Sequence, residues 1–479
     1  MPDTYDLIVI GAGPVGENIA DYAVKRGLTA AIVESELVGG ECSYWACMPS
    51  KTLLRSGAVL AAARRVPGAA EAISGTLDVA AVLKRRNEIV GDYDDGGQVE
   101  WLESVGIALF RGHGRITGPK KVSVTAADGS VTELIANHAV AVSTGTAALL
   151  PDIDGLKDVG PWTSRDATGV TDVPSSLAII GGGVVASEMA TAFTSFGTKV
   201  TVIARSGLLG GMEPFAGELV AEALETAGAT VRLGASPTAV RRDAAGTVVI
   251  QLDDGTSVTA DEVLVATGRT PRTGDLGLAS VGLEDGEWIA VDDTLLATAD
   301  TNSGDPWLYA VGDVNHRALL THQGKYQARA AGEVIAARAQ GRTVDDAPWG
   351  LHVATADNES VPQVTFTDPE VASVGLTEKA AKMAGYQTRT VDYDISSVSG
   401  AHVLAAGYAG TARMVVDEKR RVILGATFVG QDVAELLHSA TIAVVGEVPL
   451  DRLWHAVPSY PTLSEVWLRL LETYGRPDA

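Results

Sequence analysis

The stretch YDLIVIGAGPVGENIADYAVKRGLTAAIVESE, from Tyr5 to Glu36, decides the fold of this chain. An apolar run, a glycine fingerprint, a helical pattern and a second apolar run follow one another as in a strand–helix–strand unit. The predicted strands are Leu7–Ile10 and Ala30–Val33. We therefore expect a doubly wound α/β domain that starts with the first residues of the chain.

The fingerprint Gly11-x-Gly13-x-x-Gly16 suits a dinucleotide. The first glycine allows the turn, the second lets the backbone approach a pyrophosphate, and the third packs helix against strand. The pyrophosphate then lies at the helix N-terminus. Glu34 ends the second strand, at the right distance to accept a hydrogen bond from a ribose hydroxyl.

The pattern recurs between Ser176 and Gly207, in SLAIIGGGVVASEMATAFTSFGTKVTVIARSG. Here the predicted strands are Leu177–Ile180 and Lys199–Ile203, and the fingerprint positions are Gly181, Gly183 and Ala186. No acid ends the second strand. Arg205 and Ser206 stand there instead and suit a 2′-phosphate, so we expect NADPH, with NADH possible. The alternative is that Arg205 is an ordinary surface arginine.

Composition narrows the class of protein. The chain has 479 residues, enough for about three domains. Its net charge of −23 argues against nucleic-acid binding. We see no apolar run of membrane-spanning length. The N-terminus runs straight into an apolar strand without a basic segment, so we expect no signal peptide and a cytoplasmic location.

Cys42 and Cys47 are the only cysteines, five positions apart and just after a glycine pair. Three interpretations stand at this point. They are small buried apolar side chains, or zinc ligands, for which no second ligand pair is present. Alternatively they form a reversible dithiol at a helix start, where a thiolate is stabilised. Two dinucleotide sites beside a dithiol imply electrons passing between nucleotides to sulfur, a relay that a flavin supplies.

The motif GGECSYWACMPSK, from Gly39 to Lys51, resembles the redox motif of the flavoprotein disulfide reductases. That family includes dihydrolipoamide dehydrogenase, glutathione reductase and mercuric reductase, and the resemblance covers essentially the whole chain. It implies that Cys42 is the interchange thiol and Cys47 the charge-transfer thiol against the flavin. It also implies that Lys51 and Glu188 form a buried pair beside flavin N5. The plain alternative for Lys51 and Glu188 is a solvated position on a helix.

Further signatures of the family follow in order. VSTGT and VLVATGRTP look like the ends of the flavin and nicotinamide segments, and LYAVGDV like the strand whose aspartate holds the flavin ribityl region. PQVTFTDPEVASVGLTE, from Pro362, looks like the entry to the dimerisation domain, and ILGATFVGQDVAELL, from Ile423, like its central strand and helix. The implied FAD residues are Gly11, Gly13, Gly16, Glu34, Lys51, Thr144, Gly145 and Asp313. The implied NADPH residues are Gly181, Gly183, Glu188, Arg205, Ser206 and Gly268.

The C-terminal segment departs from the family. HAVPSYPTLSEVW places Tyr460 where the family has its acid/base histidine, and Glu465 at the position of the glutamate that orients it. Tyrosine titrates near pH ~10 when unperturbed, so it is a poor base at neutral pH but can donate a proton. We therefore expect an acceptor that is neither lipoamide nor glutathione. His455 is expected to be a surface histidine.

Two other departures bear on the acceptor. Tyr44 and Trp45 lie between the cysteines, where they either narrow access or stack on a flat substrate, or only pack the loop. The second nucleotide motif looks more like mercuric reductase than like the NADH-using members. The C-terminus LETYGRPDA lacks that enzyme's cysteine pair, so Hg(II) reduction is not expected.

The resulting fold prediction is α/β, with two Rossmann-like dinucleotide-binding domains and a C-terminal α+β dimerisation domain. Residues 1–150 and 273–345 are assigned to FAD binding, 151–272 to NADPH binding and 346–479 to a homodimer interface with shared active sites. A charged stretch at 76–105 is expected to form two helices broken at Gly96-Gly97. No metal site is expected.

Three functions are compared. The first is an NADPH-dependent FAD disulfide reductase whose small-molecule acceptor is a disulfide other than glutathione or lipoamide, with a bulky or aromatic group as one form of it. The second is a quinone or metal-ion reductase that uses the flavin directly. The third is a flavin-containing scaffold subunit, against which the intact redox motif argues.

Overall fold

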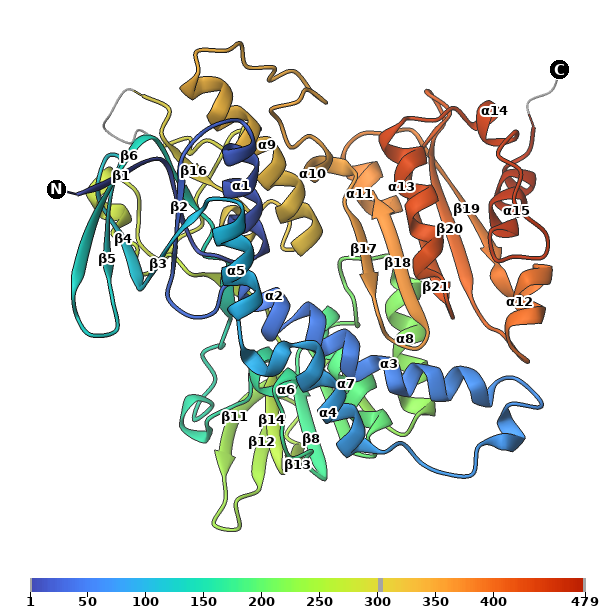
Figure 1. Ribbon diagram of the computed structural model, residues 1–479. Coiled ribbons are helices and arrows are strands. Elements are labelled where there is room, and N and C mark those ends of the chain that lie inside the picture. The colour runs from blue at the N-terminus through green and yellow to red at the C-terminus, as the bar shows by residue number, and fades with distance from the viewer. Residues whose placement is uncertain (1, 300–304, 477–479) are drawn as a thin grey trace. The chain divides into compact units, whose positions relative to one another are not determined.

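The computed structural model describes residues 2–299 and 305–476. The chain divides into two compact units, each assembled from three separate segments. Residues 1–49, 87–147 and 269–358 form the first unit, and residues 50–86, 148–268 and 359–479 form the second. Figure 1 labels the elements of both.

The first unit is built on a sheet in the order β3-β2-β1-β6-β5-β4, with β16 also paired to β6. The strands β1, β2, β3 and β16 run parallel to their neighbours, with β3 at one edge, and β4 and β5 extend the other side as antiparallel strands. The strands are β1 (Asp3–Ile10), β2 (Ala30–Glu34), β3 (Ala108–Arg111), β4 (His113–Gly118), β5 (Lys121–Thr125), β6 (Val131–Val142) and β16 (Leu308–Ala310).

Helices cover this sheet. The helices α1 (Pro14–Lys25) and α9 (Thr321–Ala339) pack against each other so closely that a Cβ on Gly332 would meet Tyr22 Cβ at 2.5 Å. The remaining helices here are α2 (Gly40–Tyr44), α3 (Cys47–Arg64), α4 (Val79–Ile89), α5 (Gly96–Ser104) and α10 (Ala356–Glu359), and α3, α4 and α10 continue across a unit boundary.

The stretch 76–105 forms two helices, as predicted, but the predicted break is wrong. The chain turns before the glycine pair, because Gly96 begins α5, and the Gly96 N–H donates to Asp94 Oδ1 at 2.8 Å.

The second unit holds a parallel sheet in the order β10-β9-β8-β14 and an antiparallel sheet β11-β12-β13. Its strands are β8 (Ser176–Ile180), β9 (Lys199–Ala204), β10 (Thr230–Leu233), β11 (Pro237–Arg242), β12 (Val248–Leu252), β13 (Ser257–Ala260) and β14 (Glu262–Val265). The helices are α6 (Ser164–Thr168), α7 (Val184–Ser195) and α8 (Pro214–Thr226). The short strands β7 (Thr146–Ala148) and β15 (Arg269–Pro271) pair where the chain passes between the units.

A five-stranded antiparallel sheet, β17-β18-β21-β20-β19, forms the C-terminal part. Its middle strand β21 is buried at all nine positions, which confirms the central strand predicted from Ile423. The strands are β17 (Pro362–Thr365), β18 (Glu370–Gly375), β19 (Thr388–Asp394), β20 (Thr411–Asp417) and β21 (Val422–Gly430). The helices are α11 (Glu378–Met383), α12 (Ser399–Leu404), α13 (Leu437–Val445), α14 (Leu450–Leu453) and α15 (Glu465–Tyr474).

These sheets confirm the predicted class: two α/β sheets built around parallel strands, followed by a C-terminal α+β part. Both glycine fingerprints follow a parallel strand directly, β1 in one case and β8 in the other. Within residues 2–299 and 305–476, no helix combines the length and the apolar character that a bilayer crossing needs.

Candidate active site

The first glycine fingerprint forms an open cradle at the end of β1. Gly11 has φ +102°, and a Cβ there would meet Ser143 O at 2.4 Å, so only glycine fits. A Cβ on Gly16 would lie 1.9 Å from Gly11 O, which fixes the close approach of helix α1 to the strand. Gly13 has nothing within 4 Å of its Cβ position. The backbone is therefore accessible where a pyrophosphate would bind.

Polar groups surround this cradle. Glu34 Oε2 accepts a hydrogen bond from Ala12 N at 2.7 Å, which places the carboxylate at the fingerprint turn. Thr144 Oγ1 is buried and has no hydrogen-bond partner among the described residues. Gly145 follows it with φ +66°. These features fit a bound flavin dinucleotide: the turn is accessible, a carboxylate lies where a ribose would bind, and a buried hydroxyl lacks a hydrogen-bond partner among the described residues.

Asp313 lies at the end of β16, next to Gly312, whose φ is +84°. Its carboxylate accepts a hydrogen bond from Thr146 Oγ1 at 2.9 Å, and Arg269 Nε also donates to that hydroxyl at 2.9 Å. Burial raises the pKa of Asp313, against the opposing effects of the Thr146 hydrogen bond and the Arg269 charge. The predicted ribityl-binding aspartate is thus half-buried and held by the two short segments around β7 and β15.

The two cysteines lie on consecutive helices. Cys42 is in the short helix α2, and Cys47 is the first residue of α3. Both side chains are half-buried. Thr321, the first residue of α9, has its Oγ1 3.3 Å from Cys47 Sγ. Cys47 therefore meets a hydroxyl and the N-terminal ends of two helices, an environment that stabilises a thiolate.

The aromatic residues of the redox loop pack it from behind. Tyr44 is 1% exposed, and its hydroxyl donates to Val38 O at 3.0 Å. Burial, with Asp95 nearby, raises the pKa of Tyr44 to about 12. The rings of Trp45 and Tyr93 lie 5.6 Å and 6.5 Å from that of Tyr44. Of the interpretations left open for Tyr44, packing of the loop is the one that fits, whereas Trp45 is only half-buried.

Lys51 and Glu188 come together within the second unit. Lys51 Nζ donates to Glu188 Oε2 at 2.8 Å and lies 5.2 Å from the centroid of the Phe366 ring. Glu188 is 3% exposed, and its Oε1 accepts from Phe366 N at 3.0 Å. The surface-residue alternative is therefore wrong for Glu188. Lys51 is four residues after Cys47 in α3, one helical turn further along.

The second fingerprint repeats the geometry of the first at the end of β8. Gly181 has φ +135° and would place a Cβ 2.2 Å from Ala266 O, whereas Gly183 has nothing within 4 Å. Arg205 and Ser206 are exposed at the carboxyl end of β9. Gly268 has φ +146°, and its carbonyl accepts from Leu149 N at 3.0 Å. These residues leave the backbone of the turn open at Gly183, with an exposed arginine at the end of the next strand.

The predicted site residues near the C-terminus differ in their exposure to solvent. Tyr460 is 76% exposed. Glu465 is buried at the start of α15, and its Oε2 accepts from Gly400 N at 3.3 Å. His455 is exposed, as expected. An exposed Tyr460 is available to another molecule.

Thr321 and Tyr93 were not identified from the sequence. Both belong to segments far along the chain from the cysteines, and neither carries a motif. The only signal for Thr321 is its position, eight residues after Asp313, at the start of a long helical pattern.

Comparison with known proteins identifies the family. The model for pyridine nucleotide-disulphide oxidoreductases matches residues 5–341, and the model for the dimerisation domain of the same family matches residues 361–470. The chain belongs to the pyridine nucleotide-disulphide oxidoreductases. Members of this family are enzymes that use a flavin and a nicotinamide nucleotide in redox chemistry at sulfur.

Relatives match over nearly the whole chain. A mercuric reductase of Staphylococcus aureus is 30% identical, over 96% of this chain and 81% of the relative. A dihydrolipoyl dehydrogenase of Chlorobaculum tepidum is 31% identical, over 96% of this chain and 95% of the relative.

Solved structures support the same fold. The HOCl-induced flavoprotein disulfide reductase RclA of Escherichia coli, in its Cu(II) complex, has a TM-score of 0.82 at 22% identity, covering 98% of this chain and 99% of that one. LpdA of Mycobacterium tuberculosis has a TM-score of 0.81 at 24% identity, covering 97% of this chain and 99% of that one. Together, the family models and the relatives confirm the resemblance to the flavoprotein disulfide reductases.

Proposed function

We propose that this oxidoreductase passes electrons from NADPH through FAD to the Cys42–Cys47 pair and on to a disulfide acceptor other than lipoamide or glutathione. The observation that carries the proposal is the environment of Cys47, whose sulfur lies 3.3 Å from the Thr321 hydroxyl at the start of α9. A thiolate is favoured there, as a redox thiol requires.

The chain's own residues divide the work of binding. The glycine turn, Glu34, Thr144, Gly145 and Asp313 hold FAD, and Gly181, Gly183, Gly268, Arg205 and Ser206 hold NADPH. Bound FAD supplies the two-electron relay between the nicotinamide and the cysteines. Lys51, held by Glu188 at 2.8 Å, provides a fixed positive charge one helical turn from Cys47. Residues 1–150 and 273–345 carry the flavin, 151–272 the nicotinamide and 346–479 the dimer contact.

The thiols complete the reaction. The Cys42 thiolate attacks one sulfur of the acceptor disulfide, forms a mixed disulfide and expels the first product as a thiolate. The Cys47 thiolate then attacks Cys42 Sγ, expels the second product thiolate and regenerates the Cys42–Cys47 disulfide. Each turnover consumes one two-electron equivalent from NADPH. The partner subunit's Tyr460 donates a proton to a leaving thiolate, a role for which its hydroxyl is suited.

An anaerobic titration of the FAD-loaded enzyme with NADPH tests this proposal. We expect a long-wavelength charge-transfer band after two electrons, because the Cys47 thiolate then lies against the oxidised flavin. A flavin that bleaches without such a band would contradict the proposal, since the cysteines would not be accepting electrons.

Direct reduction of a quinone or metal ion is the second candidate. It is favoured by the similarity to mercuric reductase and to RclA, whose structure is that of a Cu(II) complex. Cys42→Ser separates the two, with Ser43→Ala as the neighbouring control. Loss of disulfide reduction in Cys42→Ser supports the first proposal, whereas quinone reduction that survives in Cys42→Ser supports the second.

A further inference from the structure

A buried carboxylate lies at the end of the first unit. The Asp357 side chain, in α10, is 0% exposed. Two glutamines of α9 donate to it: Gln323 Nε2 to Oδ1 and Gln327 Nε2 to Oδ2, each at 2.8 Å. Such a group is costly to bury, so its partners matter. It stands four residues before the part of the chain that matches the family's dimerisation domain.

The amide of Gln327 connects this carboxylate to the turn that carries Asp313. Gln327 is fully buried, and its Oε1 accepts from Gly312 N at 2.7 Å and from Asn315 Nδ2 at 2.8 Å. Since the amide nitrogen already donates to Asp357, the orientation of the amide is fixed by the network. A flipped amide would direct its NH₂ group at the Gly312 N–H.

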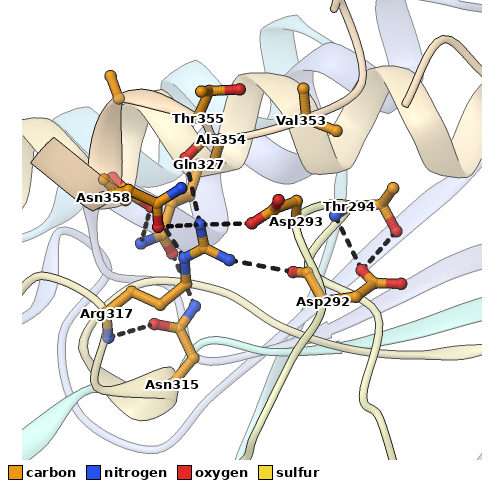
Figure 2. A network of polar contacts seen from close by, with 12 residues as sticks. Asp292, Asp293, Thr294, Asn315, Arg317, Gln327, Val353, Ala354, Thr355 and Asn358 are labelled. Atoms are coloured by element: carbon orange, nitrogen blue, oxygen red, sulfur yellow. Dashed lines mark hydrogen bonds and ion pairs between the residues drawn. The ribbon is translucent and has the colours of Figure 1, made fainter. Parts of the chain in front are cut away.

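Arg317 also belongs to this network of polar contacts and lies beside Asn315 and Asp293 (Figure 2). Its Nε lies 3.4 Å from Asp357 Oδ2, and its Nη2 donates to Asp293 Oδ1 at 2.9 Å. Arg317 N in turn donates to Asn315 Oδ1 at 3.0 Å, so the arginine and the turn are tied together. Burial raises the pKa of Asp357, and the charge of Arg317 and the two glutamine hydrogen bonds oppose that rise.

We propose that Asp357 is a positioning residue for the flavin: it sets the Gln327 amide, which holds the Gly312–Asp313 turn in its binding geometry. The inference rests on the proposed role of Asp313 in binding FAD. The turn at Gly312, whose φ is +84°, has its own short 3₁₀ hydrogen bonds, in which the carbonyls of Gly312 and Asp313 accept from Asn315 N and His316 N. The Gly312 N–H is not used in them and donates to Gln327 Oε1, so the side-chain acceptor holds the donor that the turn itself leaves open. Thr146, on the other side of Asp313, completes the support through its hydroxyl.

A donor–acceptor exchange tests the proposal. Asp357→Leu removes the acceptor that orients the Gln327 amide, so that amide can flip, and a flip costs the bond from Gly312 N. Gln327→Glu keeps the acceptor for Gly312 but sets two carboxylates together. In the double variant Asp357→Asn/Gln327→Glu, the amide at position 357 donates to the carboxylate at position 327, which still accepts from Gly312 N. The net charge is that of wild type. Gln340→Glu is the matched control, because that side chain lies at the other end of α9 and bonds to Arg26 and Arg342.

The readout is FAD affinity, measured by flavin fluorescence when FAD is added to flavin-free protein, with the visible flavin spectrum alongside. We expect each single variant to bind FAD roughly tenfold or more weakly, the double variant to recover to within about threefold of wild type, and the control to match wild type. Should the single variants not fold, the double variant alone gives the result.

Single variants that bind FAD as wild type does, or a double variant no better than the worse single one, would overturn the inference while leaving the proposed function intact. A wild-type chain that does not bind FAD would overturn both.

Discussion

The hydroxyl of Thr321 makes a contact that a thiolate can use, because Oγ1 and Cys47 Sγ are 3.3 Å apart. Thr321→Val keeps the shape of the side chain but removes the hydroxyl. We predict that this variant has a weaker charge-transfer band. A hydrogen bond to a charged group is worth about 1.5–3 kcal/mol. The pH at which the band disappears on acidification therefore moves up by about one to two units.

Absorbance of the two-electron-reduced enzyme, followed from pH 9 to pH 4, measures the effect of Thr321→Val, with Thr321→Ser as the control that keeps the hydroxyl. Coincident titrations of the valine variant and wild type would show that the hydroxyl does not stabilise the thiolate.

Glu17, near the start of α1, gives a pH-dependent prediction. Burial raises its pKa to about 7, opposed by Lys325 and assisted by Glu34, and Oε1 has no hydrogen-bond partner among the described residues. Because the folded chain holds this proton more tightly than the unfolded chain, stability is lost as pH rises from 4.5 towards 7. At about 1.4 kcal/mol per pKa unit, the free energy of unfolding falls by about 3 kcal/mol over this pH range.

Thermal unfolding of flavin-free protein at pH 5 and pH 8 tests this. We expect Glu17→Gln to be more stable than wild type at pH 8, with the advantage shrinking at pH 5. An equal difference at both pH values would mean that Glu17 does not titrate in this range.

At the residue scale, the sequence was most informative where chemistry restricts the choice of residue. Gly11 and Gly181 were identified because only glycine adopts their backbone angles against a neighbouring carbonyl. Lys51 and Glu188 were paired by family resemblance, and they do form an ion pair. Thr321 and Gln327 were not predicted, because their roles depend on tertiary contacts. A hydroxyl or an amide in a helical pattern gives no sign of such contacts.

At the scale of elements, apolar runs predicted the strands well. The runs Leu7–Ile10 and Lys199–Ile203 lie within β1 and β9, since buried parallel strands are nearly uniformly apolar. The glycine pair at 96–97 misled the prediction, because glycine serves a helix N-terminus as readily as a break. Periodicity could not indicate that Asp94 accepts a hydrogen bond from the first N–H of that helix.

The turn after β9 carries the prediction on nucleotide choice. Arg205 is exposed there, in place of the acid that a ribose hydroxyl would require. We predict that Arg205→Glu lowers the ratio of kcat/KM for NADPH to that for NADH by about 10–100-fold, the value of one charge-assisted contact to phosphate. Steady-state kinetics with both nucleotides measures it.

Arg241→Glu provides the matched control, because Arg241 is also exposed but belongs to β11, in the antiparallel sheet β11-β12-β13. An unchanged ratio in Arg205→Glu, or an equal change in the control, would remove Arg205 from the proposed site.

At the scale of the whole molecule, the dimerisation domain and the 76% exposure of Tyr460 bear on one question: whether an active site takes residues from two chains. If it does, Cys42→Ser and Tyr460→Phe damage different halves of a site. A mixed dimer of the two variants then contains one site with both native residues and one with neither. Random reassociation makes about half of the dimers mixed, so about a quarter of all sites are intact.

We therefore predict that reassociating the two inactive or slow variants restores acceptor turnover to about a quarter of the wild-type rate, above the mean of the separate homodimers. Tyr460→Phe alone should reduce its flavin with NADPH as fast as wild type, because that step precedes the proton transfer. Mixing two batches of Cys42→Ser controls for the reassociation procedure. Turnover equal to the mean of the homodimers would show that Tyr460 serves no partner, since residues within one chain cannot be complemented by exchange.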